Sequence, residues 1–475
     1  MQSPGVKAAF WILLISTIFL YFTHPAYETY GLDFFRYWTL SKTSLTHRGA
    51  EIYTDMDAVR KVQAEALLVR LKDDQEIRER LGFQPDLEWI LKTVPTLPDP
   101  RSSGSILPLK YLVEWDAMYE YVTTMGARMT PAAFGIVRAV GLDRFDYKKA
   151  FFLWNFFAIF CILLGVYLLQ KTIGFTEIPF PLVAFLVLWF DPVRTALLSG
   201  QVMELLFLIT VVVMFLIDRA EMRCPMLAGV LLGFGLVTKP LVAGLVVFLV
   251  WSVLFREKKR PYGVALFGFC IGSICTVAYY EWLLGAGIWD EWLRTFPTWY
   301  QQVEFHIGSI SNRSPIGAAI SWFGVEQHHW FPLYFHRVYV AAILSFYVYW
   351  FLIPANRARM IKNSHTAFCL ALMGPILISR FALFHYGVLL IVPFFVVLHR
   401  LLVLYNSQKE SSRAIAFLLL LSWFGIGFYE TFRFLLLAKS EVIFYPILAG
   451  MLVMTRSPDT PSEDPQHYGA PQQQS

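Results

Sequence analysis

The sequence predicts an all-α polytopic membrane protein. Of its 475 residues, 56% are hydrophobic and only 16% are charged, whereas a typical soluble domain carries about 25% charged residues. The mean hydropathy of +0.51 points the same way. Apolar runs recur along most of the chain, and many approach the roughly 20 residues that a helix needs to cross a bilayer.

About twelve of these apolar runs are candidate spans. They cover residues 8–23, 149–170, 179–197, 201–217, 226–238, 240–255, 262–286, 334–353, 364–379, 386–404, 413–431 and 434–454. The first run follows Lys7 and precedes a weak cleavage-like "HPA", so a signal peptide is an alternative there. Its Trp, Phe and Ile content, and the spans that follow it, favour an uncleaved signal anchor.

Basic residues cluster in short loops between alternate spans. If the N-terminus is cytoplasmic, all four clusters face the cytoplasm, as the positive-inside rule requires; they are residues 218–223, 256–261, 356–362 and 408–413. We therefore expect an integral protein of the plasma (inner) membrane with both termini in the cytoplasm.

This topology leaves two long segments on the non-cytoplasmic face, a first outer loop at 24–148 and a second at 287–333. Residues 1–455 then form one transmembrane domain. Residues 456–475 are polar and rich in Pro and Gln, which is typical of a disordered tail. That tail would be cytoplasmic.

Several function classes find no support in the sequence. A net charge of +5 is small for this length and does not suggest nucleic-acid binding, and the five cysteines lie in or beside apolar runs without a metal-ligand or disulfide pattern. Asp55 and Asp57 have a metal-binding spacing, but such pairs are common by chance in a charged segment. No nucleotide-binding motif is present. We therefore expect no metal and no cofactor, and a donor that is activated as a lipid.

One carboxylate lies close to the expected outer edge of the membrane. Asp33 stands in "GLDFFRYW", residues 31–38, between apolar and aromatic neighbours. Partial desolvation would suit a general base, although an ordinary solvated loop aspartate is the alternative. Tyr37 could stack on a sugar or pack the loop against the interface. Further along this loop, residues 64–82 and 112–130 have apolar residues at helical spacing.

Lys239, in "TKPL", lies between two apolar segments. A lysine at membrane depth is costly, so it usually pairs with an anion or faces a polar cavity; snorkelling to the interface is the alternative. The run "LLSGQVMELL" at 197–206 places Gln201 and Glu204 at another helix start. Glu204 is a candidate partner for Lys239.

Two later motifs also lie at the outer edge. In "SRFALFHYG", Arg380 could hold a phosphate through two hydrogen bonds and His385 could move a proton near neutral pH, although interfacial packing is the alternative for His385. In "SISNRSP", Asn312 and Arg313 could recognise sugar hydroxyls or phosphate.

The motifs described above follow one another in an order that resembles glycosyltransferase family 87. The strongest part is the glycine-patterned run "LAGVLLGFGLVTKPL", and the resemblance spans roughly residues 30–400. It implies a GT-C-type fold and inverting transfer of a sugar, mannose-like first of all, from a polyprenyl-phosphate donor to a lipid or glycan acceptor on the outer face. A transporter or flippase of a lipid-linked or amphipathic solute is the alternative, but it leaves the long outer loop and its edge carboxylate unexplained.

The resemblance also implies roles for single residues. Asp33 matches the family's first-loop catalytic aspartate, Lys239 its Lys-Pro lysine, and His385 the first histidine of a late motif. The chain departs from the family pattern at Glu204, Arg380 and Tyr386. The expected catalytic pair is therefore Asp33 and His385. The expected phosphate-binding cations are Lys239, Arg380 and Arg313. The expected sugar or acceptor contacts are Tyr37, Gln201, Glu204 and Asn312.

Overall fold

The computed structural model describes most of the chain. The described residues are 4–23, 31–123, 129–175, 178–217, 219, 221–295, 312–324, 330–380, 382–406, 411–429 and 439–455. The predicted tail at 456–475 and part of both outer loops, including 296–311, lie outside them. Among the described residues the regular structure is helical, and the β-type pairing consists of one isolated bridge between Asn312 and Leu383.

Five helices are long and apolar enough to cross a membrane. They are α1 (Pro4–Thr23), α9 (Tyr147–Ile173), α15 (Lys259–Leu284), α18 (Trp330–Phe351), and the continuous η7 (Phe384–Leu390) and α21 (Ile391–Asn406). Two bent pairs raise the number to seven if each is one span: α10 (Phe180–Leu188) with α11 (Asp191–Ser199), and α19 (Pro354–Lys362) with α20 (Ser364–Ile378). The all-α polytopic membrane protein is confirmed.

Shorter apolar helices account for the other expected spans. They are α12 (Met203–Ile217), α13 (Arg223–Thr238), η6 with α14 (Pro240–Val242, Ala243–Phe255), α22 (Ser411–Gly427), and η8 with α24 (Ser440–Ile443, Phe444–Met454). Each predicted apolar segment therefore coincides with a helix or a bent pair of helices. A count of twelve complete crossings stays a prediction, because these helices are short for a full span.

The first outer segment is folded into helices rather than being an open loop. It contains α2 (Leu32–Thr43), α3 (Glu51–Thr54), α4 (Met56–Asp73), α5 (Gln75–Leu81), α6 (Leu87–Thr93), η2 (Val94–Thr96), η3 (Leu109–Tyr111), α7 (Leu112–Thr123), α8 (Pro131–Ala139) and η5 (Leu142–Arg144). Aspartates start three of these helices, since Asp55, Asp74 and Asp86 accept hydrogen bonds from backbone N–H groups of α4, α5 and α6. In the "TDMD" motif, Asp55 is thus a helix cap.

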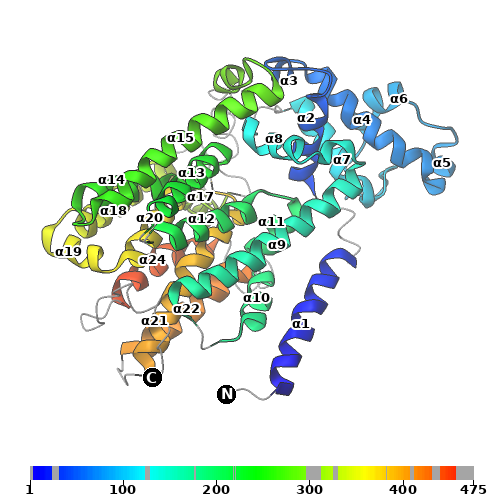
Figure 1. Ribbon diagram of the computed structural model, residues 1–475. Coiled ribbons are helices and arrows are strands. Elements are labelled where there is room, and N and C mark those ends of the chain that lie inside the picture. The colour runs from blue at the N-terminus through cyan, green and yellow to red at the C-terminus, as the bar shows by residue number, and fades with distance from the viewer. Residues whose placement is uncertain are drawn as a thin grey trace.

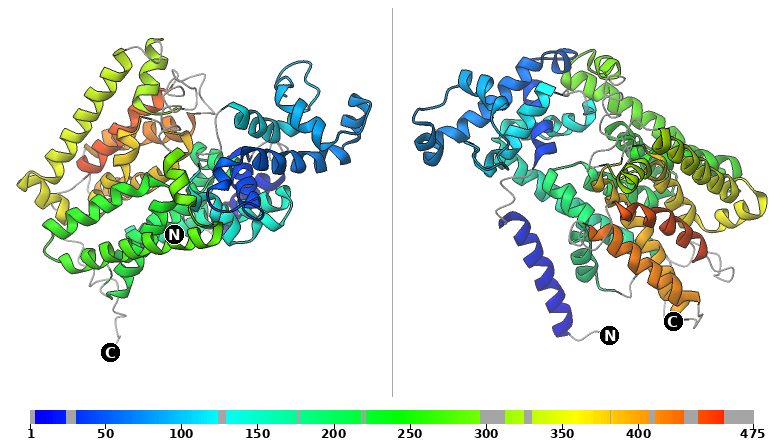
Figure 2. Two further views of the ribbon diagram at one scale, coloured as in Figure 1. Left: turned by 90° about the horizontal axis from the view of Figure 1, so that it is seen from above. Right: turned by 180° about the vertical axis from the view of Figure 1, so that it is seen from behind.

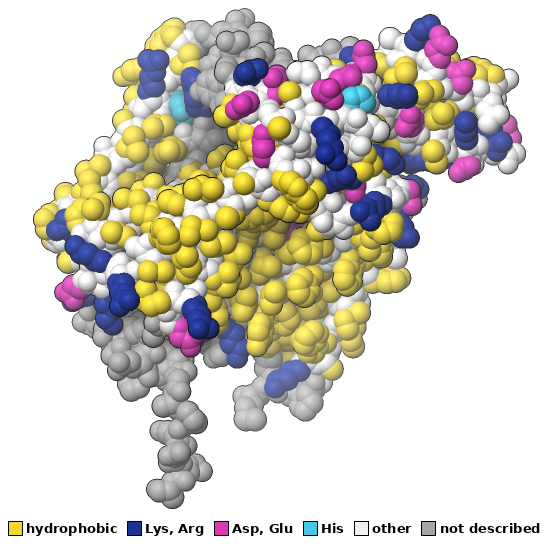
Figure 3. All heavy atoms as spheres, turned by 45° about the horizontal axis from the view of Figure 1, so that its top comes forward, with side chains coloured by type: hydrophobic (Ala, Val, Ile, Leu, Met, Phe, Trp, Pro, Cys, Tyr) yellow, Lys and Arg dark blue, Asp and Glu magenta, His cyan; other side chains and the backbone are white. Residues whose placement is uncertain are grey.

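The helices separate into two regions (Figure 1). Helices α9 to α24 form a bundle, and α2 to α8 gather at one end of it, where α4, α5 and α6 project to the side in all views (Figures 1 and 2). Figure 3 shows hydrophobic side chains covering the bundle, while acidic and basic side chains gather over the projecting region. An apolar band next to a charged end is the surface expected of a membrane-embedded bundle with an extramembrane part.

Helices α13 and α15 pack backbone to backbone. A Cβ atom added to Gly229 would collide with the carbonyl oxygen of Ala265, and one added to Gly272 would collide with the carbonyl of Val230. Such small-residue contacts allow close helix approach inside a membrane. The glycine run of α13 therefore fixes the end of this helix, where Lys239 follows.

Helix α2 is held on α9 by aromatic packing. The ring of Phe34 lies 5.6 Å from that of Phe151 and 5.5 Å from that of Trp154. Gly200, at the end of α11, has a φ of +71°, and a Cβ there would strike the Cβ of Phe34. Glycine satisfies both the left-handed turn and the close approach. This contact brings the extramembrane helix α2 against the α11–α12 junction.

Candidate active site

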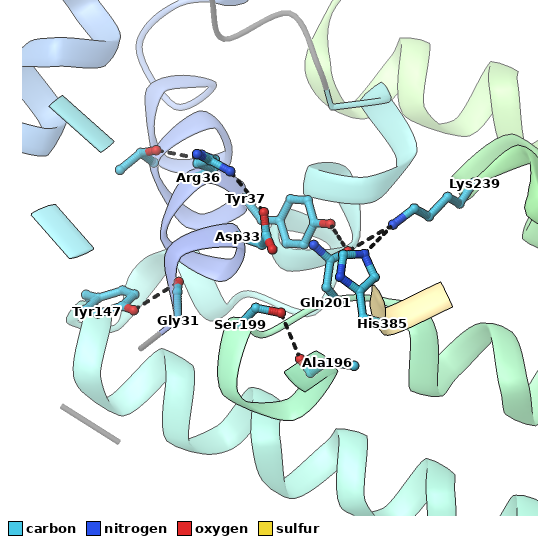
Figure 4. Close-up of polar contacts among 11 residues, drawn as sticks. Gly31, Asp33, Arg36, Tyr37, Tyr147, Ala196, Ser199, Gln201, Lys239 and His385 are labelled. Carbon is cyan, nitrogen blue, oxygen red and sulfur yellow. Dashed lines mark hydrogen bonds and ion pairs between the residues drawn. The ribbon is translucent and has the colours of Figure 1, made fainter. Parts of the chain in front are cut away.

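Side chains from four separate elements meet where α2 contacts the bundle. Helix α2 supplies Asp33 and Tyr37, the α11–α12 junction supplies Gln201, the end of α13 supplies Lys239, and η7 supplies His385 (Figure 4). In the topology predicted from the loops, all four positions lie on the outer side of the membrane. The structure therefore brings together five residues that the sequence singled out separately.

Gln201 is the centre of this group. Its side-chain oxygen Oε1 accepts a hydrogen bond from the Tyr37 hydroxyl at 3.2 Å and another from Nζ of Lys239 at 3.0 Å (Figure 4). Its backbone oxygen accepts from the indole N–H of Trp154 at 3.3 Å. The amide is 3% exposed, so a single buried acceptor orients both the tyrosine and the lysine.

Lys239 has neutral neighbours. Besides Gln201, its Nζ lies 3.5 Å from Nε2 of His385 and 4.7 Å from the ring centroid of Tyr386. The lysine is partly buried, and it forms no ion pair with a carboxylate of the described residues. The predicted pairing with Glu204 is wrong, because the hydrogen bond goes to Gln201. A cation held only by neutral groups keeps its charge available for an anionic ligand.

Asp33 lies in the first turn of α2 and not in a loop. Its Oδ1 is 3.0 Å from Nη1 of Arg36, and the two side chains are 18% and 14% exposed. A negative charge is favoured at this helix end by the helix dipole. The helix starts after Gly31, whose φ is +101° and whose carbonyl accepts from the Tyr147 hydroxyl at 3.2 Å (Figure 4). Arg36 is not among the predicted site residues, although its three-residue spacing from Asp33 is a usable signal of this pair.

Glu204 lies one helical turn after Gln201, in the first turn of α12. It is 1% exposed, and neither carboxyl oxygen has a hydrogen-bond partner. It makes no ion pair with Lys239, whose Nζ contacts Gln201 instead. Glu204 therefore lies behind the site, and its predicted contact with the sugar or acceptor stays a prediction.

The two late motifs are joined to each other by hydrogen bonds. The Asn312 side chain accepts from the backbone N–H of Ala382 at 3.1 Å and donates to the carbonyl of Arg380 at 3.2 Å. Ser314 also donates to that carbonyl, at 2.7 Å. Since Asn312 is fully buried and its amide is bound to backbone on both sides, we assign it a positioning role. Its predicted contact with sugar stays a prediction.

Arg313 lies in the same motif as Asn312 and contacts residues outside the two motifs. Its Nη1 lies 3.1 Å from Oε1 of Glu441, and its guanidinium is stacked 4.6 Å from the ring centroid of Tyr429. The residue is 6% exposed. This charge is paired with a buried carboxylate, and the phosphate-binding role of Arg313 stays a prediction. The neighbouring Arg380 keeps its phosphate-binding role as a prediction.

No group of three or more His, Cys, Asp or Glu side chains in the described ranges is arranged to hold a metal ion. The residues that meet at the site are one carboxylate, one ammonium, one imidazole and the amide and phenol between them. A carboxylate and an ammonium can together move a proton and receive negative charge.

Fold and site together define a polytopic membrane protein with a polar site at the end of its helix bundle, on the side of the charged extramembrane region. The sequence model of glycosyltransferase family 87 matches residues 131–379, slightly more than half of the chain. The chain belongs to this family and is a membrane glycosyltransferase. No curated protein and no solved structure matches it.

The matched range is narrower than the resemblance inferred from the landmarks. It contains Gln201, Lys239 and Asn312, whereas Asp33 and His385 lie beyond its two ends. The structure, and not the family match, brings these last two residues to the site, where His385 contacts Lys239 and Asp33 lies on α2 (Figure 4).

Proposed function

We propose that this glycosyltransferase moves a mannose-like sugar from a polyprenyl-phosphate donor to a lipid or glycan hydroxyl, with inversion at the anomeric carbon. The reaction takes place on the non-cytoplasmic face of the plasma membrane, in a GT-C-type fold with about twelve spans. The observation that carries the proposal is the ammonium of Lys239, which is held by neutral partners where α2 brings Asp33 to the same site (Figure 4).

A lipid-linked donor suits the position of the site. Lys239 follows an apolar helix of the bundle, and Asp33 lies on the extramembrane helix α2. A polyprenyl chain would remain in the bilayer while its phosphate reaches Lys239 and its sugar faces α2. The sequence contains no nucleotide-binding motif, so the activated sugar has to arrive in another form.

The reaction proceeds as one displacement. The acceptor hydroxyl oxygen forms a bond to the anomeric carbon as the bond from that carbon to the phosphate oxygen breaks, and the hydroxyl proton passes to Asp33. The negative charge that develops on the departing phosphate is stabilised by Lys239, which is the largest need of such a transition state. Because His385 contacts Lys239 and not Asp33, we place it on the phosphate side and prefer Asp33 as the base.

Gln201 and Tyr37 hold the ammonium of Lys239 in position for this reaction. The amide oxygen of Gln201 holds the ammonium in place without cancelling its charge, which a carboxylate would do. Tyr37 donates to the same oxygen and limits how the amide can rotate. Tyr37 and Gln201 are therefore positioning residues first, and any contact they make with the sugar adds to that role.

The alternative of a transporter or flippase is disfavoured by the family to which the chain belongs. The two functions are separated by incubating the purified protein in liposomes with polyprenyl-phosphate mannose, radiolabelled in the sugar, and a lipid acceptor fraction. Transfer of label to the acceptor with release of polyprenyl phosphate supports the proposal. Movement of intact donor across the bilayer, with no transfer, contradicts it.

A further inference from the structure

A second polar cavity lies away from the candidate active site. It is a groove of about 710 Å³ in the extramembrane region, between α2, α4, η3, α7 and the start of α9. Its volume falls in the range of about 300–1,000 Å³ that is typical of ligand sites. None of the candidate active-site residues lines it.

Helix α2 is shared between the groove and the active site. Trp38 and Lys42 line the groove, whereas Asp33 and Tyr37 point toward Gln201 and the active site (Figure 4). On a helix, these two pairs lie on different faces. A molecule bound in the groove would therefore be separated from the reacting centre by the thickness of one helix.

The groove lining includes a buried ion pair. Arg70 and Glu114 are paired, and Arg70 also donates to the carbonyl of Lys110 at 2.8 Å. Glu114 is fully buried, and its second carboxyl oxygen has no hydrogen-bond partner. This buried pair joins α4 to α7 and forms a fixed part of the groove wall.

Groups of both signs continue around the groove. Lys42 and Lys148 are donors, while Glu65 and Asp73 are acceptors. Against the opposing effect of partial burial, hydrogen bonds from Lys110 and Tyr111 lower the pKa of Asp74 to about 2, so this carboxylate is charged at neutral pH.

This lining fits a ligand that both donates and accepts hydrogen bonds without carrying charge. A polyanion would be repelled by the carboxylates, and a lipid chain would find polar walls. Sugar hydroxyls donate and accept, and the apolar ring faces of a sugar can pack on aromatic side chains such as Trp38 and Tyr147, which line the same groove. We propose that the groove binds the neutral oligosaccharide part of a glycan acceptor, an inference that rests on the proposed transferase function.

The test uses the full-length protein in fluorescent nanodiscs on an array of short mannose, glucose, galactose and arabinose oligosaccharides, with sulfated oligosaccharides beside them. Val69 lines the groove and is 63% exposed, so Val69→Trp fills the groove with little effect on packing. Lys72, also exposed on α4 but outside the groove, provides the matched control Lys72→Trp.

We expect the wild-type protein and Lys72→Trp to bind at least one neutral series, and Val69→Trp to bind it about tenfold more weakly or worse, a loss of about 1.4 kcal/mol. The proposal is overturned if no neutral oligosaccharide binds, if sulfated ones bind preferentially, or if Val69→Trp binds like the wild type. Transfer to a simple alkyl alcohol should be the same in Val69→Trp and wild type. A failed array with intact transfer would thus reject the groove alone.

Discussion

The Nζ atom of Lys239 lies 3.0 Å from the side-chain oxygen of Gln201, an amide and not a carboxylate. This choice of partner fixes the position of the ammonium and leaves its charge uncompensated by direct contact. An anionic ligand is the natural complement of such a group. The predictions below test this relationship and the geometry that maintains it.

Gln201→Glu should weaken donor binding while preserving the fold. The substitution changes one amide nitrogen to oxygen, but it pairs Lys239 with a carboxylate and also repels the donor phosphate. We expect the donor Kd to rise about tenfold or more, with a melting temperature equal to or above that of the wild type. Donor binding to purified protein measures the effect. Unchanged affinity would show that Lys239 does not meet the phosphate.

The charge of Lys239 should matter more than its exact shape. Lys239→Arg should retain part of the activity, because a guanidinium also binds phosphate. Lys239→Met keeps the length and removes the charge, so it should lose most of the transfer and bind donor weakly. Titration of both variants with polyprenyl-phosphate mannose is the measurement. Normal donor binding by Lys239→Met would remove this residue from the site.

Asp33→Asn should abolish most of the chemistry without affecting the donor. The amide keeps the shape and cannot accept the proton, and a positioned general base contributes about 10²–10⁴-fold. We expect transfer to fall at least about a hundredfold, with donor affinity nearly unchanged. Melting temperature serves as the control, since Asp33 also pairs with Arg36 and a folding role would lower it. Near-normal turnover would make His385 the better candidate for the base.

The face of the active site can be tested by labelling. In a variant whose five native cysteines are replaced, a single Cys at position 85 should react with a membrane-impermeant maleimide applied to intact cells. A single Cys at position 258 should react only after the membrane is opened. The reverse pattern would place the first outer segment, and the proposed reaction, in the cytoplasm.

The packing of α13 on α15 predicts a stability effect at a distance from the site. Gly229→Ala directs a methyl group at the carbonyl of Ala265 and should cost about 1–3 kcal/mol of unfolding free energy. Gly263→Ala, on α15, meets no atom within 4 Å and is the matched control. Thermal unfolding in detergent compares the two. Equal stability of both variants would contradict the close helix approach.

The helices of the bundle were predictable because membrane-spanning segments are recognisable by their hydrophobic composition. Within the described residues, each expected apolar run overlaps a helix or a bent pair of helices, and Lys239 lies between two apolar helices as expected. The first outer segment was harder, since its helices are amphipathic and short. Its N-cap aspartates, such as Asp74 and Asp86, were the available signals.

The sequence predicts which residues belong to the site, but not which of them contact one another. Gln201, Lys239 and His385 were chosen one by one, yet the partner of Lys239 was assigned to Glu204, one turn away from Gln201. The partner of Arg313, Glu441, is 128 residues further along the chain. Contacts between residues so far apart in the chain depend on how helices pack, and local sequence patterns do not reveal them.

The order of the active-site elements along the chain has a consequence for biosynthesis. Lys239 and its partner Gln201 are inserted together early, whereas His385 and Tyr386 follow only after α15, α18 and α20. Since chains are made from the N-terminus, a nascent protein holds the ammonium on the amide alone while the later helices are still being made. The contacts of His385 and Tyr386 with Lys239 would therefore form among the last of the site, after Asp33, Gln201 and Lys239 have been synthesised.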